Sequence, residues 1–582
     1  MGLAALGLFH GAKKRLNSLG WLLTPTAGMH GQCMSRVQQI TVYAQSNEDQ
    51  AMNDDKLYLR SNVVVEPLID NWYAWSHLVS PATAAMNIVN RHLRIMESYV
   101  KAPQVHASAA KNPAMLGGPF VDYDGKRVDE VKALIEETRR ERGQMIEFAA
   151  AIVELDQILR SEAHGLSLEP LYDKVPDILK GYVELVYDLN NNASFRFIEP
   201  LLYKSRFYDS TRQTLMLSLI ERDERPFVLS TPRLRDSDEL HLRIPFHDER
   251  IDRLFETKTK PQSRRRLKEM LQFGDEDDNL FSTFLTAERP APYQRYEGNG
   301  VRWRYFGHAC ILVETADISI ILDPVLSYTY DNHQVSRYTY DHLPDEIDYA
   351  IITHNHQDHI LFETMLQIRH KVKNIVVPRS GGGMLQDPSL KLMFQHLGFK
   401  NVIELDEFER VAVSSGFLLG LPFFGEHSDL FIRTKMAWLM QLGKYRLLFA
   451  ADSCNVEFRL YDHIRREVGE IDALFLGMEC NGAPLSWLYG PLLAKPLDRK
   501  MDQSRRLCGS NYERGIDIVR KFNCKDVYVY AMGQEPWLNY VMSLKYTEQS
   551  KPIVDSNKLI ADCRNRGIRS ERLFGEREIL YP

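Results

Sequence analysis

The chain contains little cysteine, and its cysteines form no recognisable pattern. Among 582 residues there are seven, at positions 33, 310, 454, 480, 508, 524 and 563, and no two are spaced as CxxC. An odd, scattered set is typical neither of a disulfide framework nor of a thiolate zinc site. The sequence therefore predicts free thiols and a cytoplasmic location.

Long hydrophobic runs are also missing. The nearest candidate, "VAVSSGFLLGLPFF" at 411–424, is shorter than the roughly 18 to 20 residues of a membrane-spanning helix and contains Gly and Pro. It predicts a buried strand and turn, so we expect no association with a membrane.

The N-terminus does not have the pattern of a secretory signal. Its Lys13, Lys14 and Arg15 follow an apolar patch, whereas a secretory signal places positive charge before a longer apolar core. Met34 is an alternative start of the natural protein. We expect residues 1–56 to be a weakly structured extension.

No charge of one sign dominates. The formal net charge is -6, with 44% hydrophobic and 26% charged residues. This composition excludes both the basic footprint of a nucleic-acid binder and the balance of a disordered chain. The run Arg264 to Arg266 is interpreted as a solvated face, with docking of an acidic partner as the alternative.

The length predicts at least two domains, because one hydrophobic core does not serve 582 residues. In 57–255, apolar residues between Asp129 and Arg160 recur every three or four positions, which predicts a long amphipathic helix that can break at Gly143. Helical patterns also occupy about 169 to 220. We expect this first domain to be a mostly helical α+β domain.

The sequence pattern changes in the second half of the chain. The polar stretch 256–300 is predicted to be a linker with an embedded helix. After it, short β-rich runs such as "VRWRYFGHACILVET", "DYAIITH" and "DVYVYAMG" alternate with amphipathic stretches. This pattern predicts a sheet covered by helices over 301–582.

The segment "HNHQDH" places His354, His356, Asp358 and His359 directly after a predicted buried strand. Residues two apart share a face in an extended chain, so the first two histidines can hold one ion while Asp358 and His359 reach a second. Burying these groups is costly unless a cation satisfies them. The pattern predicts a site for two metal ions.

More ligand candidates follow at later strand ends. These are Glu426 and His427 in "GEHSDL", Asp452 in "LLFAADSCN" and Glu479 in "LFLGMECNG". The segments "FGHACILVE", "ILDPVLSY" and "HNHQDH", together with Asp452, resemble the sequence pattern of the metallo-β-lactamase fold. The resemblance implies an αββα sandwich in 301–582 after a separate α+β domain, and it leaves the reaction open.

Some polar and aromatic residues near these motifs are interpreted as structural. His308 and Asp323 stand at strand entries, where a polar side chain often satisfies backbone groups. Cys454 is interpreted as a small buried residue. The aromatic residues Trp72, Tyr73 and Trp75 are interpreted as core.

Two departures from the hydrolases of this fold favour iron. Glu426 stands where those enzymes usually place a histidine, and no histidine follows His463. Carboxylate in place of imidazole makes the ligand set harder and more anionic, which stabilises oxidised iron and gives zinc no comparable advantage. The dizinc alternative remains open, with His427 as the rival ligand to Glu426.

The combination of HxHxDH with Glu426 and Asp452 is similar to the diiron β-hydroxylases of nonribosomal peptide biosynthesis, over nearly the whole chain after about residue 57. The resemblance implies two iron ions, O2 as co-substrate and an external electron donor, hence a separate reductase. It also implies an aminoacyl substrate held as a thioester on a carrier (thiolation) domain. The first domain is expected to serve dimerisation and substrate access, giving a homodimer.

The resemblance also assigns roles to residues. His354, His356 and Glu426 are expected to bind one iron and Asp358 and His359 the other. Asp452 is expected to bridge them, and Glu479 to bind the second iron, with hydrogen bonding to a ligand histidine as the alternative. Glu426, Asp452 and Glu479 are thus the catalytic carboxylates.

Two other functions compete with this interpretation. One is a dizinc hydrolase acting on a lactone, phosphodiester or thioester, with metal-bound hydroxide as nucleophile and Asp358 or Asp452 handling the proton. The other is a member of the fold that binds a partner without turnover.

Overall fold

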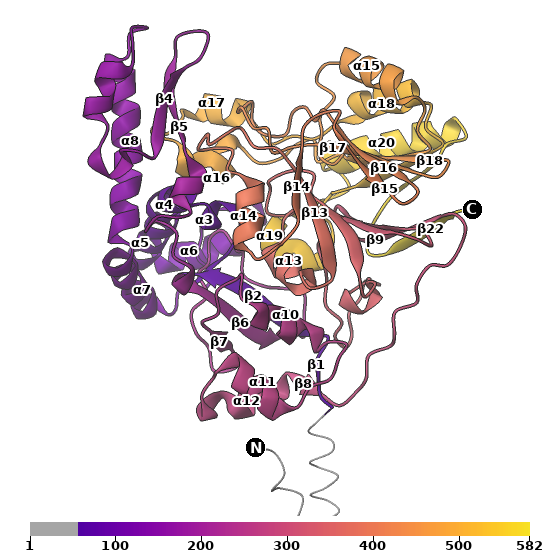
Figure 1. The fold of residues 1–582 in the computed structure, drawn as a ribbon, viewed down its shortest axis with the longest axis horizontal. Helices are drawn as coiled ribbons and strands as arrows, with labels where there is room; N and C mark the ends of the chain where they lie inside the picture. The colour runs from indigo at the N-terminus through magenta and orange to yellow at the C-terminus, as the bar shows by residue number, and fades with distance from the viewer. Residues whose placement is uncertain (1–55) are drawn as a thin grey trace, which may run out of the picture.

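Two sheets of seven strands form the C-terminal part of the chain in the computed structural model, which describes residues 56–582 (Figure 1). The expected weakly structured extension lies, apart from Lys56, outside the described residues. The strand order of the first sheet is β14 (Val402–Leu405), β13 (Val372–Pro378), β12 (Ile347–Ile351), β11 (Ser319–Leu322), β10 (Cys310–Glu314), β9 (Val301–Gly307) and β22 (Arg577–Tyr581). That of the second is β15 (Arg410–Val413), β16 (Gly416–Leu421), β17 (Ala437–Leu442), β18 (Tyr445–Phe449), β19 (Ala473–Gly477), β20 (Asp526–Tyr530) and β21 (Arg569–Arg572).

The two sheets pack face to face through buried aromatic side chains. Trp303 of β9 meets Phe475 of β19 and Tyr528 of β20 edge-on, with ring centroids 5.1 and 4.7 Å apart. Such edge-to-face pairs add to the stabilisation that burial alone gives. The rings therefore tie the middle of one sheet to the middle of the other.

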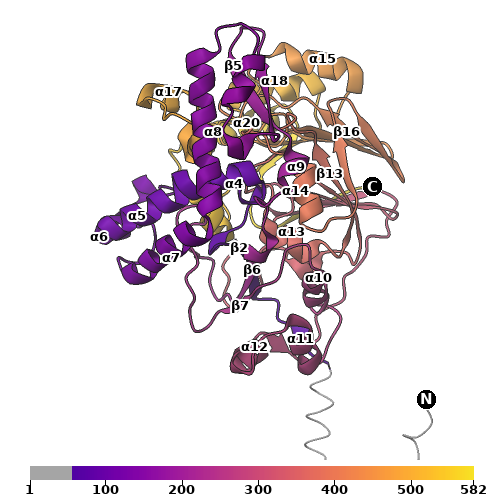
Figure 2. The ribbon, with the colours of Figure 1, turned by 60° about the vertical axis from the view of Figure 1, so that its left-hand side comes forward.

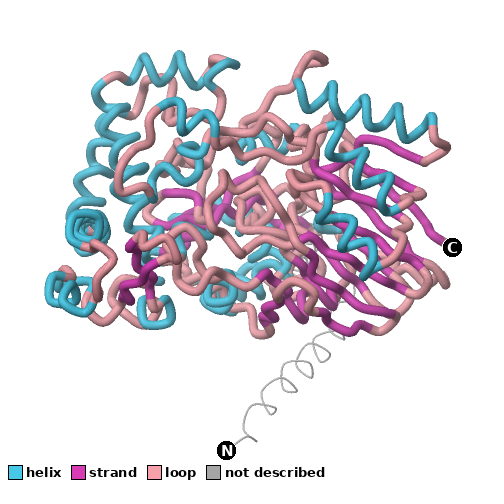
Figure 3. Tube along the Cα trace, turned by 90° about the horizontal axis from the view of Figure 1, so that it is seen from above, coloured by secondary structure: helices cyan, strands magenta, loops and turns pink. Residues whose placement is uncertain are grey.

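Helices cover the outer faces. The second sheet is covered by α15 (Arg459–Val468), α18 (Tyr512–Phe522) and α20 (Lys551–Asn565) (Figure 1). The first sheet packs against α13 (Phe362–Ile368), α14 (Leu390–His396) and the N-terminal part of the chain. The αββα sandwich expected for 301–582 is confirmed. Figure 3 shows its strands gathered on the side of the C-terminus.

The N-terminal part combines a small antiparallel sheet with helices. The sheet runs β3 (Trp72–Tyr73), β2 (Val63–Ile69), β6 (Gln213–Leu219) and β7 (Leu240–Leu242). The helices are α3 (Ser76–Val79), α4 (Pro81–Asn87), the π-helical η1 (Ile88–Leu93), α5 (Arg94–Lys101), α6 (Pro103–Ala110), α7 (Val128–Glu141) and α8 (Gly143–Glu162). The mostly helical α+β domain is thus confirmed, and the aromatic residues expected in its core are buried.

The long amphipathic helix breaks where predicted, between α7 and α8. Helix α8 stands upright in Figure 2 and packs beside α4. Arg142 leaves the helical conformation at φ -111° and ψ 21°. Its Nε lies 2.9 Å from Asp70 Oδ2, and both side chains are buried. The ion pair therefore holds the break in place.

The helices predicted over 169–220 are wrong for most of that stretch. It contains the hairpin β4 (Val183–Tyr187) and β5 (Ala193–Phe197), the short α9 (Glu199–Leu202), single 3-10 turns and β6. β6 pairs along its whole length with β2, far earlier in the chain. Because such pairing depends on tertiary structure, local periodicity did not reveal it.

The stretch 256–300 carries more structure than one helix. It follows α10 (Glu249–Glu256) and contains α11 (Arg264–Leu271), α12 (Asp278–Thr283) and β8 (Leu285–Thr286), which pairs with β1 (Tyr58–Leu59). The division of the chain at 255 and 300 stays a prediction. None of the helices in 56–582 has the length and apolar character needed to cross a membrane.

A buried charge cluster joins the two halves. Glu66 of β2 accepts hydrogen bonds from Arg233 Nε and from Arg225 Nη1, at 2.5 and 2.9 Å. The same Arg225 nitrogen lies 3.0 Å from Glu363 Oε2 on α13, and Tyr328 OH donates to the other Glu363 oxygen at 2.6 Å. The N-terminal sheet is thus fixed against the helix that follows the "HNHQDH" segment.

Candidate metal centre

The predicted ligands gather where strands of both sheets end. His354 to His359 follow β12 of the first sheet, while Glu426, Asp452 and Glu479 follow β16, β18 and β19 of the second. Side chains at strand ends along one edge of a sandwich can converge. Four strands from the two sheets thereby contribute to the same site.

Three sets of nitrogen and oxygen atoms lie close enough to hold a cation. Within each set the ligand atoms are within 4.8 Å of one another: His354, His356 and Glu426; His354, His359 and Asp452; and His308, Asp358 and His359. Asp452 Oδ2 lies 3.0 Å from His359 Nε2 and 3.7 Å from His354 Nε2. This carboxylate oxygen therefore lies close to two of the histidines of the "HNHQDH" segment.

The residues present fit a pair of metal ions. Asp452 Oδ1 is buried and has no hydrogen-bond partner among the described residues, and the buried Glu426 Oε2 faces imidazole nitrogens of His356 and His427 at 3.1 and 3.3 Å. Burial raises the pKa of Glu426 although His356 opposes it, and burial followed by the charges of Asp452, Glu426 and Asp358 raises that of Glu479 well above its usual value. Cations remove this repulsion and satisfy the free oxygens.

The histidines are prepared for metal binding in two ways. Burial, together with the neighbouring imidazoles, lowers the pKa of His354 well below its usual value, so its nitrogen carries a free lone pair. Burial also lowers that of His359, but Asp323, Asp358 and Asp452 outweigh it and hold the pKa well above its usual value. A cation replaces the proton that these carboxylates favour.

Hydrogen bonds from behind orient two of the ligand histidines. His359 Nδ1 lies 2.8 Å from Asp323 Oδ2, and Asp323 Oδ1 accepts from Thr353 N at 2.7 Å. His356 Nε2 lies 3.0 Å from Tyr489 OH, which leaves Nδ1 facing Glu426 Oε2 at 3.1 Å. Partners of this kind fix the tautomer and direction of a ligand imidazole.

Sequence reasoning missed part of this arrangement. Asp323 does satisfy a backbone group, as expected, and in addition it orients His359. His308, interpreted as structural, places Nε2 3.1 Å from Asp358 Oδ2 and belongs to one of the three sets. Tyr489 is 133 positions from His356, and no local pattern singles it out.

A tight turn places Glu426 and its neighbour His427 differently, although His427 Nδ1 lies 3.3 Å from Glu426 Oε2. Gly425 and Glu426 have positive φ angles of 76° and 64°, and a Cβ on Gly425 would lie 2.4 Å from the Cβ of Cys454. The turn directs Glu426 to His356, while the His427 ring packs 4.5 Å from the His356 ring and its nitrogens join none of the three sets. Cys454 is buried, as expected.

A hollow of about 430 Å³, here called the inner hollow, gives access to these groups. Five acidic or imidazole residues line it: His356, Asp358, Glu426, Asp452 and Glu479. Its walls include Trp487, Leu488, Leu507, Met542 and Leu544. Glu479 thus reaches the hollow but joins none of the three ligand sets. A lining that combines acidic, imidazole and apolar side chains suits a small organic substrate held beside metal ions.

Comparisons with known proteins agree with this geometry. Residues 58–290 match the family described as the diiron non-heme beta-hydroxylase N-terminal domain, and residues 319–483 match the beta-lactamase superfamily domain. The chain is 39% identical over 529 residues to the 4-amino-L-phenylalanyl-[CmlP-peptidyl-carrier-protein] 3-hydroxylase of Streptomyces venezuelae, covering 90% of this chain and 99% of that one. The chain belongs to the diiron β-hydroxylases.

The fold of this diiron β-hydroxylase is shared along its length with a solved relative. The crystal structure of CmlA, a diiron beta-hydroxylase from Streptomyces venezuelae, matches with a TM-score of 0.85 at 38% identity, covering 90% of this chain and all of that one. A mutant of CmlA matches with a TM-score of 0.84. The expected family and two-part architecture are confirmed.

Membership also decides between the competing functions. The chain is an enzyme, a β-hydroxylase whose cofactor is a pair of iron ions. The dizinc hydrolase and the partner-binding fold member are not favoured. The expected iron cofactor is confirmed, and the donors that surround the inner hollow suit it.

Proposed function

We propose that this diiron β-hydroxylase adds a hydroxyl group to the β-carbon of an aminoacyl group held as a thioester on a nonribosomal peptide carrier domain. The observation that carries the proposal is the inner hollow, which opens onto Glu426, Asp452 and Glu479 beside the histidines. The relative from Streptomyces venezuelae acts on an aminoacyl group bound to a peptidyl carrier protein.

Each ligand has a proposed role. His354, His356 and Glu426 hold one iron, Asp358 and His359 hold the other, and Asp452 bridges them. The support is that the first three form one set of close ligand atoms and that Asp452 Oδ2 faces both His354 and His359. Glu479 is proposed as a ligand of the second iron, with hydrogen bonding to a ligand histidine as the alternative.

The iron pair supplies the oxidation chemistry, and the protein side chains position the ligands and the substrate. When bound, the iron pair uses O2 and two external electrons to replace a hydrogen on the substrate carbon by hydroxyl. Asp323 and Tyr489 keep the imidazoles of His359 and His356 in position. His308 Nε2 lies beside Asp358 Oδ2 and can donate to it. Trp487, Leu488 and Leu507 supply apolar surface in the inner hollow for the substrate side chain.

The partners follow from the same proposal. A separate reductase supplies the electrons, because the sequence shows no flavin or iron-sulfur motif. The enzyme acts as a homodimer through its N-terminal domain. A cytoplasmic location is supported by the free cysteines at 310, 454, 480, 508, 524 and 563.

The test is to incubate the iron-loaded enzyme with O2, a reductant and carrier domains loaded with different amino acids. A gain of one oxygen on the acyl group, located at the β-carbon by fragmentation, supports the proposal. Release of the free amino acid without added oxygen would instead indicate thioester hydrolysis. Incorporation of oxygen on nitrogen would also contradict the proposal.

A further inference from the structure

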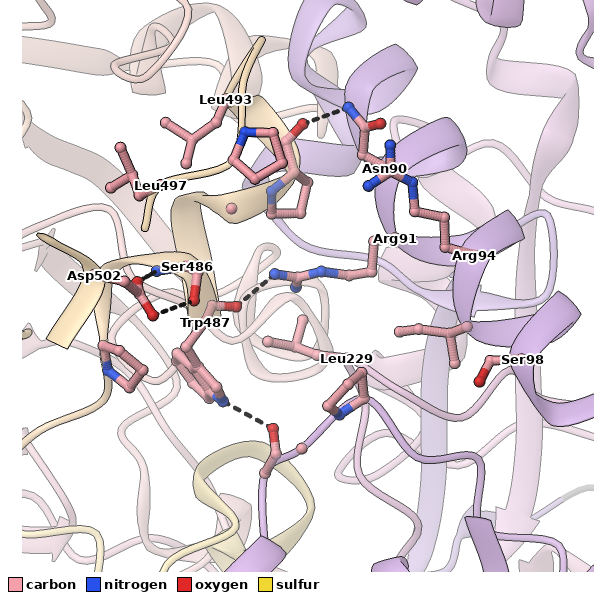
Figure 4. A pocket seen from close by; sticks show the side chains of 18 of the residues that line it. Asn90, Arg91, Arg94, Ser98, Leu229, Ser486, Trp487, Leu493, Leu497 and Asp502 are labelled. Atoms are coloured by element: carbon pink, nitrogen blue, oxygen red, sulfur yellow. Dashed lines mark hydrogen bonds between the residues drawn. The ribbon is translucent and has the colours of Figure 1, made fainter. Parts of the chain in front are cut away.

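A second hollow, here called the outer hollow, lies between the N-terminal helices and α16 (Leu485–Tyr489) (Figure 4). Its volume is about 840 Å³. Asn90 and Arg91 face it from η1, a π-helical stretch, which is rare and often found at functional sites. Apolar side chains line much of the remainder: Ile95, Val153, Phe227, Leu229, Leu493 and Leu497.

Only a thin partition separates the outer hollow from the inner hollow. Both are lined by Gly117, Pro484 and Trp487. Trp487 Nε1 donates to Gly117 O at 2.9 Å (Figure 4). Gly117 has a φ of +72°, and a Cβ there would lie 3.3 Å from the indole nitrogen, so glycine permits this close approach. Gly117, Pro484 and Trp487 are therefore shared by the outer hollow and the hollow that contains the proposed metal ligands.

The outer hollow has an excess of positive charge. Its acid, Asp502, accepts hydrogen bonds from Ser486 N and Oγ at 2.8 and 2.9 Å. Arg91 donates to Trp487 O at 2.6 Å, and burial lowers its pKa to about 10. Arg94 and Arg499 also line the hollow, and within residues 56–582 neither has an ion-pair partner. Two exposed guanidinium groups thus stand beside the apolar side chains of the outer hollow.

A third hollow, of about 530 Å³, is also lined by residues 115–118 and differs in charge. Its basic residues Arg225 and Lys545 are balanced by Asp122 and Glu224. In addition, Arg225 is already bound to the carboxylates of the interdomain charge cluster. The third hollow therefore offers no comparable site for an anion.

We propose that the outer hollow binds the phosphopantetheine arm by which a carrier domain holds its acyl group. The phosphodiester binds Arg94 and Arg499, the amide chain lies along the apolar walls, and the thioester end passes Trp487 into the inner hollow. Guanidinium groups bind phosphate oxygens with two parallel hydrogen bonds, and the volume is in the range of ligand sites. The inference rests on the proposed function, because only a tethered substrate requires an arm.

Binding of small probes tests the arm site without catalysis. The full-length, iron-loaded enzyme is titrated calorimetrically with 4'-phosphopantetheine and with pantetheine, which lacks the phosphate. The double variant Arg94→Gln, Arg499→Gln should bind the phosphorylated probe about tenfold more weakly and pantetheine unchanged. The control Arg265→Gln, an exposed arginine on α11, should bind both as the wild type does. Equal binding of the phosphorylated probe by the double variant would overturn the proposal.

Two matched alanine replacements test the route. Ala494 lines the outer hollow and Ala110 the third hollow. Ala494→Trp should abolish hydroxylation of a carrier-bound aminoacyl group with iron content unchanged, whereas Ala110→Trp should retain it. Turnover by Ala494→Trp at the wild-type rate would refute the route. If the wild type binds the phosphorylated probe through the arginines but hydroxylates no loaded carrier, the proposed function fails and the arm site stands.

Discussion

Tyr489 and His356 are joined by a buried contact of 3.0 Å between the phenol oxygen and imidazole Nε2. The opposite nitrogen, Nδ1, lies 3.1 Å from Glu426 Oε2. The phenol therefore occupies the one ring nitrogen that is not directed at the metal position. It comes from α16, the same short helix that places Trp487 between the two hollows.

Replacing Tyr489 by Phe should weaken metal binding about tenfold, since loss of such a partner frees the ligand imidazole to rotate. The measurement is a competition between the metal-free chain and a chromophoric chelator for ferrous iron. Tyr340→Phe is the control, because Tyr340 OH lies 3.0 Å from His370 Nε2, a partly buried Tyr–His contact remote from the centre. Unchanged affinity in Tyr489→Phe would show that the contact does not orient His356.

Substitutions can distinguish the proposed ligand Glu426 from its neighbour His427. Glu426→Gln keeps the shape of the side chain but removes its charge, so we expect loss of at least one iron. His427→Gln should retain both, since its ring packs against His356 without entering a ligand set. Metal analysis after growth in iron-rich medium measures this. Glu426→His should increase zinc content, because zinc accepts imidazole readily. Iron loss in His427→Gln alone would reverse the assignment.

Glu199 should make stability depend on pH. Its Oε1 accepts from Ser389 N at 3.0 Å, at the start of α14, and burial raises its pKa from 4.5 to about 7. Because the folded pKa is the higher one, the stability from this carboxyl is complete below pH 4.5 and is lost as the pH rises through about 7.

Glu199→Gln cannot ionise, so at pH 8 it should be more stable than the wild type by up to about 3 kcal/mol, with the difference vanishing toward the unfolded pKa. Melting temperatures of both chains across this pH range measure the effect. Glu154→Gln on the exposed face of α8 is the control. A difference between Glu199→Gln and wild type that does not grow with pH would contradict the prediction.

The interdomain charge cluster predicts a large loss of stability. Arg225→Met leaves Glu363 without its arginine and Glu66 with Arg233 alone, both in buried surroundings. Removing one member of a buried pair costs about 3 to 5 kcal/mol. Denaturant unfolding measures it, and Arg222→Met, an exposed neighbour, should cost little. If both variants unfold at the same denaturant concentration, the cluster does not hold the two halves together.

The sequence predicted the features that depend on local patterns. The spacing of "HNHQDH" after a buried strand indicated the ligand cluster, and the three-and-four spacing around Val131 and Ile152 indicated α7 and α8. It could not predict Tyr489 behind His356 or the pairing of β6 with β2. Both contacts join distant segments, and only the packed fold brings them together.

The late position of β22 in the sequence delays completion of the first sheet during synthesis. β22 pairs with β9 along Val301–Tyr305 and forms the edge of the first sheet. The ribosome must therefore add about 270 residues after β9 before its partner exists, which takes roughly 15 to 60 s at the usual rate of synthesis. For that time the nascent chain exposes an unpaired strand edge, which favours aggregation and capture by chaperones.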